Sequence, residues 1–196
     1  MISITDFYSQ LDTAIADSAT RRNDCKSGCS YCCYIRVVVQ AHEVFHIVQF
    51  MQKKFPPERI RQVLDRAREN CKRIEPLSVQ QHIATNIPCP LLEDGRCSVY
   101  PVRPAKCRAY HSLDVKVCEA AHIDTTYSAP HPYDVPVTLA AANYQNAFTQ
   151  AVAQHGLDAG YYELNGALLS AFTSADSAKR WRSGKRSFPA KYATNE

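Results

Sequence analysis

Eight of the nine cysteines in this chain fall into two short stretches. The first stretch reads C-x3-C-x2-C-C, and the second is spread through a segment that is interrupted by prolines. The eight residues are Cys25, Cys29, Cys32, Cys33, Cys89, Cys97, Cys107 and Cys118. Thiols gathered this densely oxidise and cross-link unless a partner holds them. The pattern therefore favours a metal ion or an iron–sulfur cluster bound by thiolates.

Disulfides are not needed to stabilise a chain of this size. With 196 residues it can bury a hydrophobic core without covalent staples. Nine is also an odd number of cysteines, which suits a ligand set with one spare thiol better than a closed disulfide framework. The ninth, Cys71, falls on the apolar stripe of a predicted helix, so we expect it to be a small buried side chain.

The composition gives little further guidance on partners. The first residues, Met1 to Tyr8, lack a basic segment followed by an apolar one, and no apolar run approaches the length of a membrane span. We therefore expect a cytoplasmic protein with no membrane contact. A net charge of +4 implies only a weak general attraction to anions.

Helical periodicity dominates both ends of the chain. It predicts a first helix from a cap at Thr5 or Asp6 to about residue 22, with Phe7 and Leu11 on its inner face. The apolar run at 35–39 suits a strand or an extended link. The other predicted helices cover 44–55, 58–75 with Pro57 at its first position, and a C-terminal pair within about 137–177 whose second member follows a cap at Asp158.

Between Cys89 and Val135 the periodicity breaks down and prolines punctuate the chain. We expect an irregular layer there, with a short ribbon that turns at Gly95, and a loose basic tail at 179–196. The predicted fold is mainly α, a single domain over 1–196. Helices at both ends would surround an irregular proline- and cysteine-rich metal-binding layer, with at most a short β-ribbon and a ligand core at about 25–118.

The first cysteine set places three thiolates within reach of one centre, whether the segment is helical or forms a tight loop at Gly28. Cys32 and Cys33 are sequence neighbours, so their side chains diverge. One tetrahedral ion does not easily take both, which predicts two metals, a cluster or one thiolate held in reserve. The spacing from Cys25 to Cys32 also matches the radical SAM signature, but the chain lacks the alternating strands and helices of that barrel.

The second set begins at Cys89, which precedes a proline and should lie in an extended loop. Cys107 falls on a predicted helical turn that begins at Arg103. His111 and His122 follow Cys107 and Cys118 by four residues and are candidate reserve ligands. We expect them instead to have hydrogen-bonded or surface roles.

Taken together, these motifs resemble the YkgJ-like cysteine-cluster family, described as a zinc- or iron-chelating domain of the CxxCxxCC type. The resemblance runs from Cys25 to Cys118 and implies metal binding; some members are called Fe–S oxidoreductases. A related cluster in flagellin lysine methylases keeps peptide or protein modification as an alternative, although this chain is much shorter. Besides the eight cysteines, the resemblance rests on Pro90, Tyr100, Arg103, Pro104, Arg108 and the early helical acid Glu43.

Two other patterns suggest different chemistry. His42-Glu43-x-x-His46 is a formal zinc-hydrolase motif, but the two histidines lie opposite the apolar stripe of Val44, and we expect a solvated helix face. A third ligand would have to come from His82, His111, His122 or His131. The basic stretch 179–186 with its tryptophan resembles a nucleic-acid contact, but no further basic stripe extends it, so we do not expect nucleic acid as a partner.

Our first hypothesis is that the eight cysteines meet in space. They would hold one iron–sulfur cluster, the preferred cofactor, or zinc or iron ions, with Arg103 and Arg108 offsetting the thiolate charge at the cofactor. The centre would be redox-active. The second hypothesis is an enzyme that modifies a peptide or small molecule at an open metal position or at a thiolate such as Cys33. A zinc hydrolase built on His42, Glu43 and His46 is the third. The expected partner is a small molecule, peptide or protein.

Overall fold

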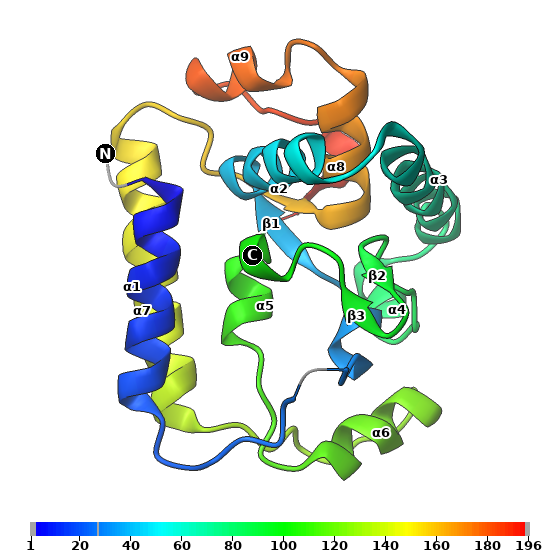
Figure 1. The fold of residues 1–196 in the computed structure, drawn as a ribbon, viewed down its shortest axis with the longest axis vertical. Helices are drawn as coiled ribbons and strands as arrows, with labels where there is room; N and C mark the ends of the chain where they lie inside the picture. The colour runs from blue at the N-terminus through cyan, green and yellow to red at the C-terminus, as the bar shows by residue number, and fades with distance from the viewer. Residues whose placement is uncertain (1–2, 27, 195–196) are drawn as a thin grey trace.

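The computed structural model describes residues 3–26 and 28–194. This part of the chain is mainly helical, which confirms the predicted fold class (Figure 1). None of the helices in the described ranges is long and apolar enough to cross a bilayer. The α-helices are α1 Ile4–Ser18, α2 Ala41–Lys54, α3 Pro57–Ile74, α4 Val79–Ile83, α5 Ala105–Ala109, α6 Val115–Ile123, α7 Val135–Gln154, α8 Leu164–Thr173 and α9 Ser177–Arg182.

The helices form two groups with a short helix between them. Helices α1 and α7 stand side by side, while α2, α3 and α8 pack together on the other side of the molecule (Figure 1). Helix α5 lies between the two groups, and α6 lies at the far end from α9 (Figure 1). Three 3₁₀ turns complete the helical structure: η1 Tyr31–Tyr34, η2 Tyr100–Val102 and η3 Ala190–Tyr192.

Two small antiparallel sheets connect these helices. One is the predicted ribbon, in which β2 Leu92–Glu93 pairs with β3 Arg96–Cys97 around a turn with positive φ at Gly95. The other was not predicted and joins three distant segments in the order β1-β4-β5. Its strands are β1 Val38–Gln40, β4 Tyr161–Glu163 and β5 Ala193–Thr194.

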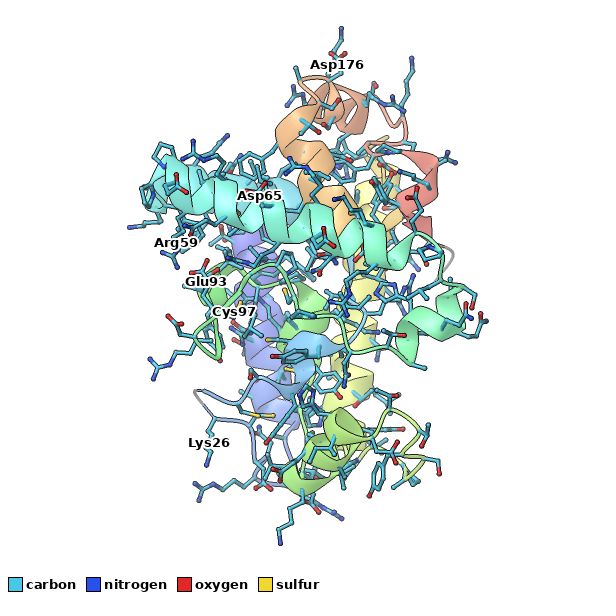
Figure 2. All side chains as sticks on the ribbon, turned by 90° about the vertical axis from the view of Figure 1, so that its right-hand side faces the viewer. Lys26, Arg59, Asp65, Glu93, Cys97 and Asp176 are labelled. Atoms are coloured by element: carbon cyan, nitrogen blue, oxygen red, sulfur yellow. The ribbon has the colours of Figure 1, made fainter. Side chains whose placement is uncertain are left out.

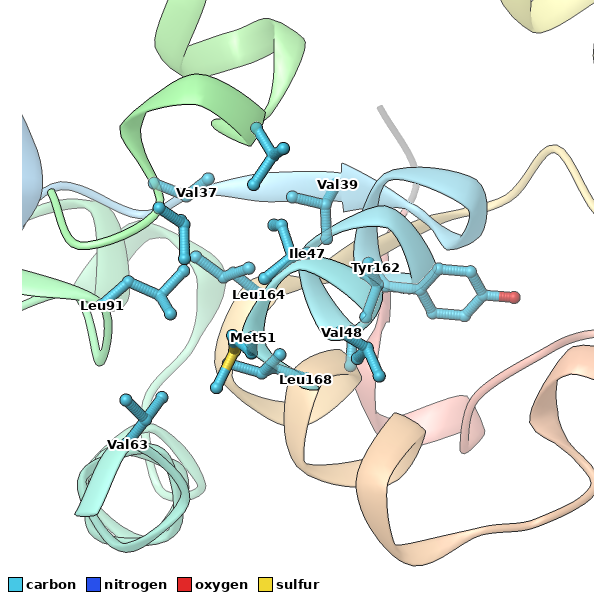
Figure 3. Close-up of a cluster of buried hydrophobic side chains, with 14 of the residues drawn as sticks. Val37, Val39, Ile47, Val48, Met51, Val63, Leu91, Tyr162, Leu164 and Leu168 are labelled. Atoms are coloured by element: carbon cyan, nitrogen blue, oxygen red, sulfur yellow. The ribbon is translucent and has the colours of Figure 1, made fainter. Parts of the chain in front are cut away.

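The main hydrophobic core lies under α2, between α3 and α8 (Figure 3). Val39, Ile47 and Met51 are fully buried there, and Leu168 closes the core from α8. A second, smaller core joins α1 to α7, where the rings of Phe7 and Phe148 stack with centroids 4.0 Å apart. Three of the four cysteines of the second set pack against the main core rather than the small one: Cys89, Cys97 and Cys107.

The helix ends differ from the predictions in detail. Helix α1 is capped by Ser3, whose hydroxyl accepts the backbone N–H of Asp6, and it ends at Ser18 instead of continuing to residue 22. Helix α3 begins at Pro57 as predicted. Helix α8 is capped by the Glu163 side chain and not by Asp158, because a strand separates that aspartate from the helix.

Asp158 has a different role: it ties the C-terminal segment to strand β4. Its carboxylate accepts hydrogen bonds from the Tyr162 hydroxyl and from both the backbone N–H and the hydroxyl of Ser187. These donors stabilise the charged form and keep the pKa of Asp158 low although burial opposes the charge. The aspartate that would have capped a helix therefore anchors the end of the chain.

The expected loose tail is therefore wrong for residues 179–194. Helix α9 packs on α8, and β5 adds to the sheet beside β4. Phe188 is 1% exposed and lies edge-on to Tyr162 with ring centroids 4.9 Å apart. The basic residues around Phe188 dominate the local sequence, so the pattern did not show that this side chain is buried. Residues 195–196 of the expected tail lie outside the described part.

The packed tail can be tested by removing its anchor. We expect Phe188→Ala to lower the free energy of unfolding by about 3–5 kcal/mol, because it empties a buried site next to Tyr162. Lys185→Ala, on the exposed part of the same segment, should change it by less than about 0.5 kcal/mol. Urea unfolding measures both. Equal, small effects of the two variants would contradict a packed tail.

Candidate metal centre

Backbone hydrogen bonds bring the two cysteine sets together. The Cys89 N–H donates to the carbonyl of Cys33 at 2.7 Å, and the Ile87 N–H donates to the carbonyl of Tyr34 at 3.2 Å. Further along, the Asp24 N–H donates to the carbonyl of Ser112 at 2.9 Å. The first set thus lies alongside both ends of the second. All nine cysteines belong to the described residues, and all are free thiols.

One group of thiols lies against the main core. Cys89 follows the extended loop after α4, Cys97 lies on β3 and Cys107 lies on α5. Burial raises the pKa of all three thiols, and within the group the charge of Cys97 raises the pKa of both Cys89 and Cys107 further. We call Cys89, Cys97 and Cys107 the core group.

A second group lies at the more open end of the site. Cys25 and Cys29 come from the loop after α1, and Cys118 comes from α6, which packs against η1. Burial raises the pKa of Cys25 and Cys118, and the charge of Cys29 raises both further. We call Cys25, Cys29 and Cys118 the loop group. Its members come from both sequence sets, so the grouping in space does not follow the grouping in sequence.

Cys32 on η1 connects the two groups. Its charge raises the pKa of Cys25 and Cys118 in the loop group, and that of Cys97 and Cys107 in the core group. The pKa of Cys32 itself is raised far above that of an ordinary thiol, first by its hydrogen bond with the Cys33 thiol and then by burial.

Several sulfur atoms lie in the region between the labelled Cys97 and Lys26 (Figure 2). Cys32 interacts electrostatically with thiols of both the core group and the loop group, and it forms a hydrogen bond with the Cys33 thiol. We call these eight thiols together the thiol cluster.

Several hydrogen-bond donors point at the sulfur atoms. The backbone N–H of Leu91 donates to Cys89, and that of Val99 donates to Cys97. In the loop group, Ser112 donates its backbone N–H to Cys25 and its hydroxyl contacts Cys118. Each of these contacts lowers the pKa of its thiol, because a donor stabilises the thiolate. Sequence reasoning missed Ser112, since nothing in the pattern sets it apart from other serines.

The two arginines expected at the cofactor have different roles. The guanidinium of Arg103 lies 4.0 Å over the ring of Tyr100 and donates to the carbonyl of that residue. Its charge lowers the pKa of Cys32, Cys97 and Cys107. Arg108 is instead part of a buried network. It pairs with Asp12, donates to the carbonyls of Pro101 and Arg103, and lies 4.1 Å over the ring of Tyr8. These partners assign Arg108 to the packing of α5 against α1.

The donor set fits zinc or iron in its chemistry. Both metals accept thiolate ligands, and backbone N–H groups already point at three of the sulfurs. Within the described ranges, however, no three His, Cys, Asp or Glu side chains are arranged so that they could hold one ion as they stand. The cysteines therefore supply the ligand type, and binding one ion would require their side chains to change position.

The two reserve histidines differ in their hydrogen bonding. His111 is 9% exposed; its Nδ1 lies 2.9 Å from the carbonyl of Ala109, and its Nε2 accepts the backbone N–H of Asp134 at 2.7 Å. This confirms the expected hydrogen-bonded role. His122 packs against the ring of Tyr34 with centroids 4.4 Å apart, and its Nδ1 has no hydrogen-bond partner in the described part of the chain.

The expected solvated face of the His-Glu-x-x-His motif is wrong. His42 is 7% exposed and Glu43 is 4% exposed, while His46 is half-buried. The motif faces the small core, where the ring of His42 lies edge-on to Phe148 with centroids 5.0 Å apart. The α1–α7 pair covers this side of α2, and the local sequence around the motif could not show that a second group of helices packs there.

Glu43 has a structural role in this position. One carboxylate oxygen accepts the Tyr8 hydroxyl at 3.2 Å and the backbone N–H of Ala105 at 2.7 Å, and the other accepts the N–H of Gln40 at 2.9 Å. Because Ala105 is the first residue of α5, this bond orients the helix that carries Cys107. The carboxylate is therefore committed to three donors and not poised to activate water.

Cys71 stands apart from the cluster, as expected of the spare thiol. It is half-buried on α3, and burial raises its pKa to about 11. The Tyr192 side chain forms a hydrogen bond with it, and no cysteine contributes to its pKa shift. Cys71 thus provides a matched control for substitutions in the cluster.

A family model matches residues 24–130, more than half of the chain, and is described as "CxxCxxCC: Putative zinc- or iron-chelating domain". The matched range contains the core group, the loop group, Cys32 and Cys33. No curated protein and no solved structure gives a significant match to the chain.

The burial of His42 predicts a specific sensitivity to acid. Burial, followed by the charge of His46, lowers the pKa of His42 to about 3. The unfolded chain takes up this proton near pH 6.5 and the folded chain does not, so folding becomes less favourable as the pH falls below 6.5. We expect a loss of about 1.4 kcal/mol per pH unit from this residue between roughly pH 6 and 4.

The measurement is urea unfolding at several pH values for the wild type and for His42→Leu. The variant should lack this part of the pH dependence. His155→Gln, which changes an exposed histidine on the C-cap of α7, should retain it. Parallel curves for the wild type and His42→Leu would contradict a neutral buried imidazole.

Proposed function

Because the chain belongs to the CxxCxxCC family of zinc- or iron-chelating domains, we propose that its clustered cysteines hold one polynuclear metal centre. The ligands are the core group, the loop group and Cys32, with Cys33 beside them. One observation carries the proposal: backbone hydrogen bonds pair the two cysteine segments, from the Cys89 N–H to the carbonyl of Cys33 and from the Asp24 N–H to the carbonyl of Ser112. Two four-cysteine sites, one in each segment, would not require this pairing.

The number of thiols in each group supports a shared ligand. Each group offers three thiols, whereas a zinc ion, or an iron–sulfur cluster as a whole, usually takes four cysteine ligands. Cys32, which interacts electrostatically with thiols of both groups, would complete either set. Cys33 is then the eighth thiol, hydrogen-bonded to Cys32 and available as a replacement ligand or as a reactive group.

An iron–sulfur cluster is the first candidate for this centre, and two zinc or iron ions are the second. Backbone N–H groups at Cys89, Cys97 and Cys25, and the positive charge of Arg103, favour a centre whose sulfur ligands carry net negative charge. An iron centre of this type would supply one-electron redox chemistry. The residues of the chain hold it, exclude water on the core side and set its charge.

A metal-dependent enzyme is the alternative function. It is favoured by a cleft on the other side of α5, since that cleft and the thiol cluster share the side chain of Tyr110. A small molecule or peptide in the cleft would lie next to the centre. In this version Cys33 or an open metal position acts on the bound molecule.

The first experiment is to purify the protein anaerobically and measure iron, zinc, sulfide and the visible absorption spectrum. We expect iron and sulfide in comparable amounts, together with a visible charge-transfer band. Zinc without colour or sulfide would replace the cluster by two zinc ions. A folded protein that takes up neither metal would overturn the proposal.

A pair of single substitutions tests the role of Cys32. We expect Cys32→Ser to lose more than half of the bound metal, because both halves of the centre depend on this thiol. Cys71→Ser removes the spare thiol on α3 and should keep the full metal content. The readout is the metal-to-protein ratio after gel filtration. Full retention in Cys32→Ser, or equal loss in both variants, would contradict a shared ligand.

A further inference from the structure

A cleft of about 480 Å³ is lined by residues of α5 and α7. Val38 of β1 and Tyr161 of β4 also line it. Helix α5 lies beside the α1–α7 pair (Figure 1). The volume lies within the range of small-molecule binding sites. Neither the thiol cluster nor the metal ligands proposed above occupy this cleft.

Small side chains on the facing helices keep the cleft open. Helix α5 contributes Ala105 and Ala109, one turn apart, and α7 contributes Ala141 and Ala142. Larger side chains at these positions would occupy the space. Together with Phe7 and Val38, the alanines give the cleft an apolar interior.

Three rings line up along one edge of the cleft. The rings of Tyr110 and His131 lie with centroids 4.9 Å apart, and those of His131 and Tyr133 are 6.3 Å apart and nearly parallel. His131 is held in place because its Nε2 lies 2.7 Å from the carbonyl of His111. An apolar interior bordered by a row of rings suits a flat molecule that can stack on them.

Among the described residues, the cleft offers a ligand a positive charge but no free negative charge. Lys106 lines it and is exposed, and its ammonium forms no ion pair within the described residues. Glu43 also borders the cleft, but its two oxygens already accept hydrogen bonds from Tyr8, Ala105 and Gln40. A ligand therefore meets an available cation and no available carboxylate.

We propose that this cleft binds a small organic anion with a flat ring. The ring lies between the alanines and the row formed by Tyr110, His131 and Tyr133, and the acidic group pairs with Lys106. A flat cation would meet Lys106 as a like charge, and a neutral ring would leave the ammonium without a partner.

The position of the cleft links it to the thiol cluster. The side chain of Tyr110 lines the cleft, and its pKa is raised to about 12 by burial and then by the charges of Cys118, Cys32 and Cys25. Lys106 directly precedes Cys107 on α5. Tyr110 thus lines the cleft and also interacts electrostatically with the cysteines. The anion site itself stands on its own lining and does not depend on which metal the cysteines bind.

The test uses three probes of equal shape: 2-naphthoate, 2-naphthamide and 2-naphthylmethylamine. Each is titrated into the full chain, as purified, and binding is followed by calorimetry and by changes in the NMR spectrum. We expect saturable binding of 2-naphthoate, with at least about fivefold weaker binding of the amide and weaker binding still of the amine. Equal affinities for the three probes, or no saturable binding of 2-naphthoate, would overturn the proposal.

Two pairs of variants locate the site. Ala142→Trp places a large ring in the cleft and should abolish binding of 2-naphthoate, whereas Ala153→Trp, at an exposed position of the same helix outside the cleft, should not. Lys106→Gln should reduce the affinity for 2-naphthoate to that for the amide, and Lys53→Gln on α2 should leave it unchanged. Binding that survives both Ala142→Trp and Lys106→Gln would place the probe elsewhere and overturn the proposal.

The metal measurement and the probe measurement test the two proposals separately. A protein that holds metal but does not bind 2-naphthoate refutes only the cleft proposal. Binding of 2-naphthoate to a protein that takes up no metal refutes only the proposed function. If both hold, addition of 2-naphthoate should alter the absorption of the metal centre, because Tyr110 borders both sites.

Discussion

The hydrogen bond from the Cys89 N–H to the carbonyl of Cys33 is the contact on which the rest of this site depends. With the bonds at Tyr34 and Ser112 it lays the first cysteine segment along the second. In this arrangement Cys118 of α6 interacts electrostatically with Cys29 and Cys32, and Cys107 of α5 interacts with Cys32 and Cys97. The main core fixes one side of the cluster and leaves the other side open.

Gathering these thiols disfavours their charged thiolate form, and a bound metal ion would stabilise it. Burial and mutual repulsion raise the pKa of most of the clustered thiols, so they hold their protons without a cation. A bound cation reverses the balance, and each ligand then releases a proton. The N–H groups of Leu91, Val99 and Ser112 and the charge of Arg103 already favour the thiolate form. The fold thus prepares these sulfurs for a positive partner.

The sequence correctly predicted the features that depend on local patterns of residues. The helices with clear apolar stripes, the start of α3 at Pro57 and the turn at Gly95 all form as expected. Contacts between distant segments could not be predicted. The burial of His42 depends on the α1–α7 pair, and the buried position of Phe188 depends on a sheet of three distant strands. The membership of the two thiol groups and the cleft beside α5 likewise arise only when these segments pack.

The central claim is that one centre joins the two thiol groups through Cys32. X-ray absorption spectroscopy of the anaerobically purified protein, at the edge of the bound metal, tests it most directly. The account predicts a shell of sulfur ligands at about 2.3 Å and a second metal atom within about 4 Å. A shell dominated by nitrogen or oxygen, or a sulfur shell with no neighbouring metal, would contradict it.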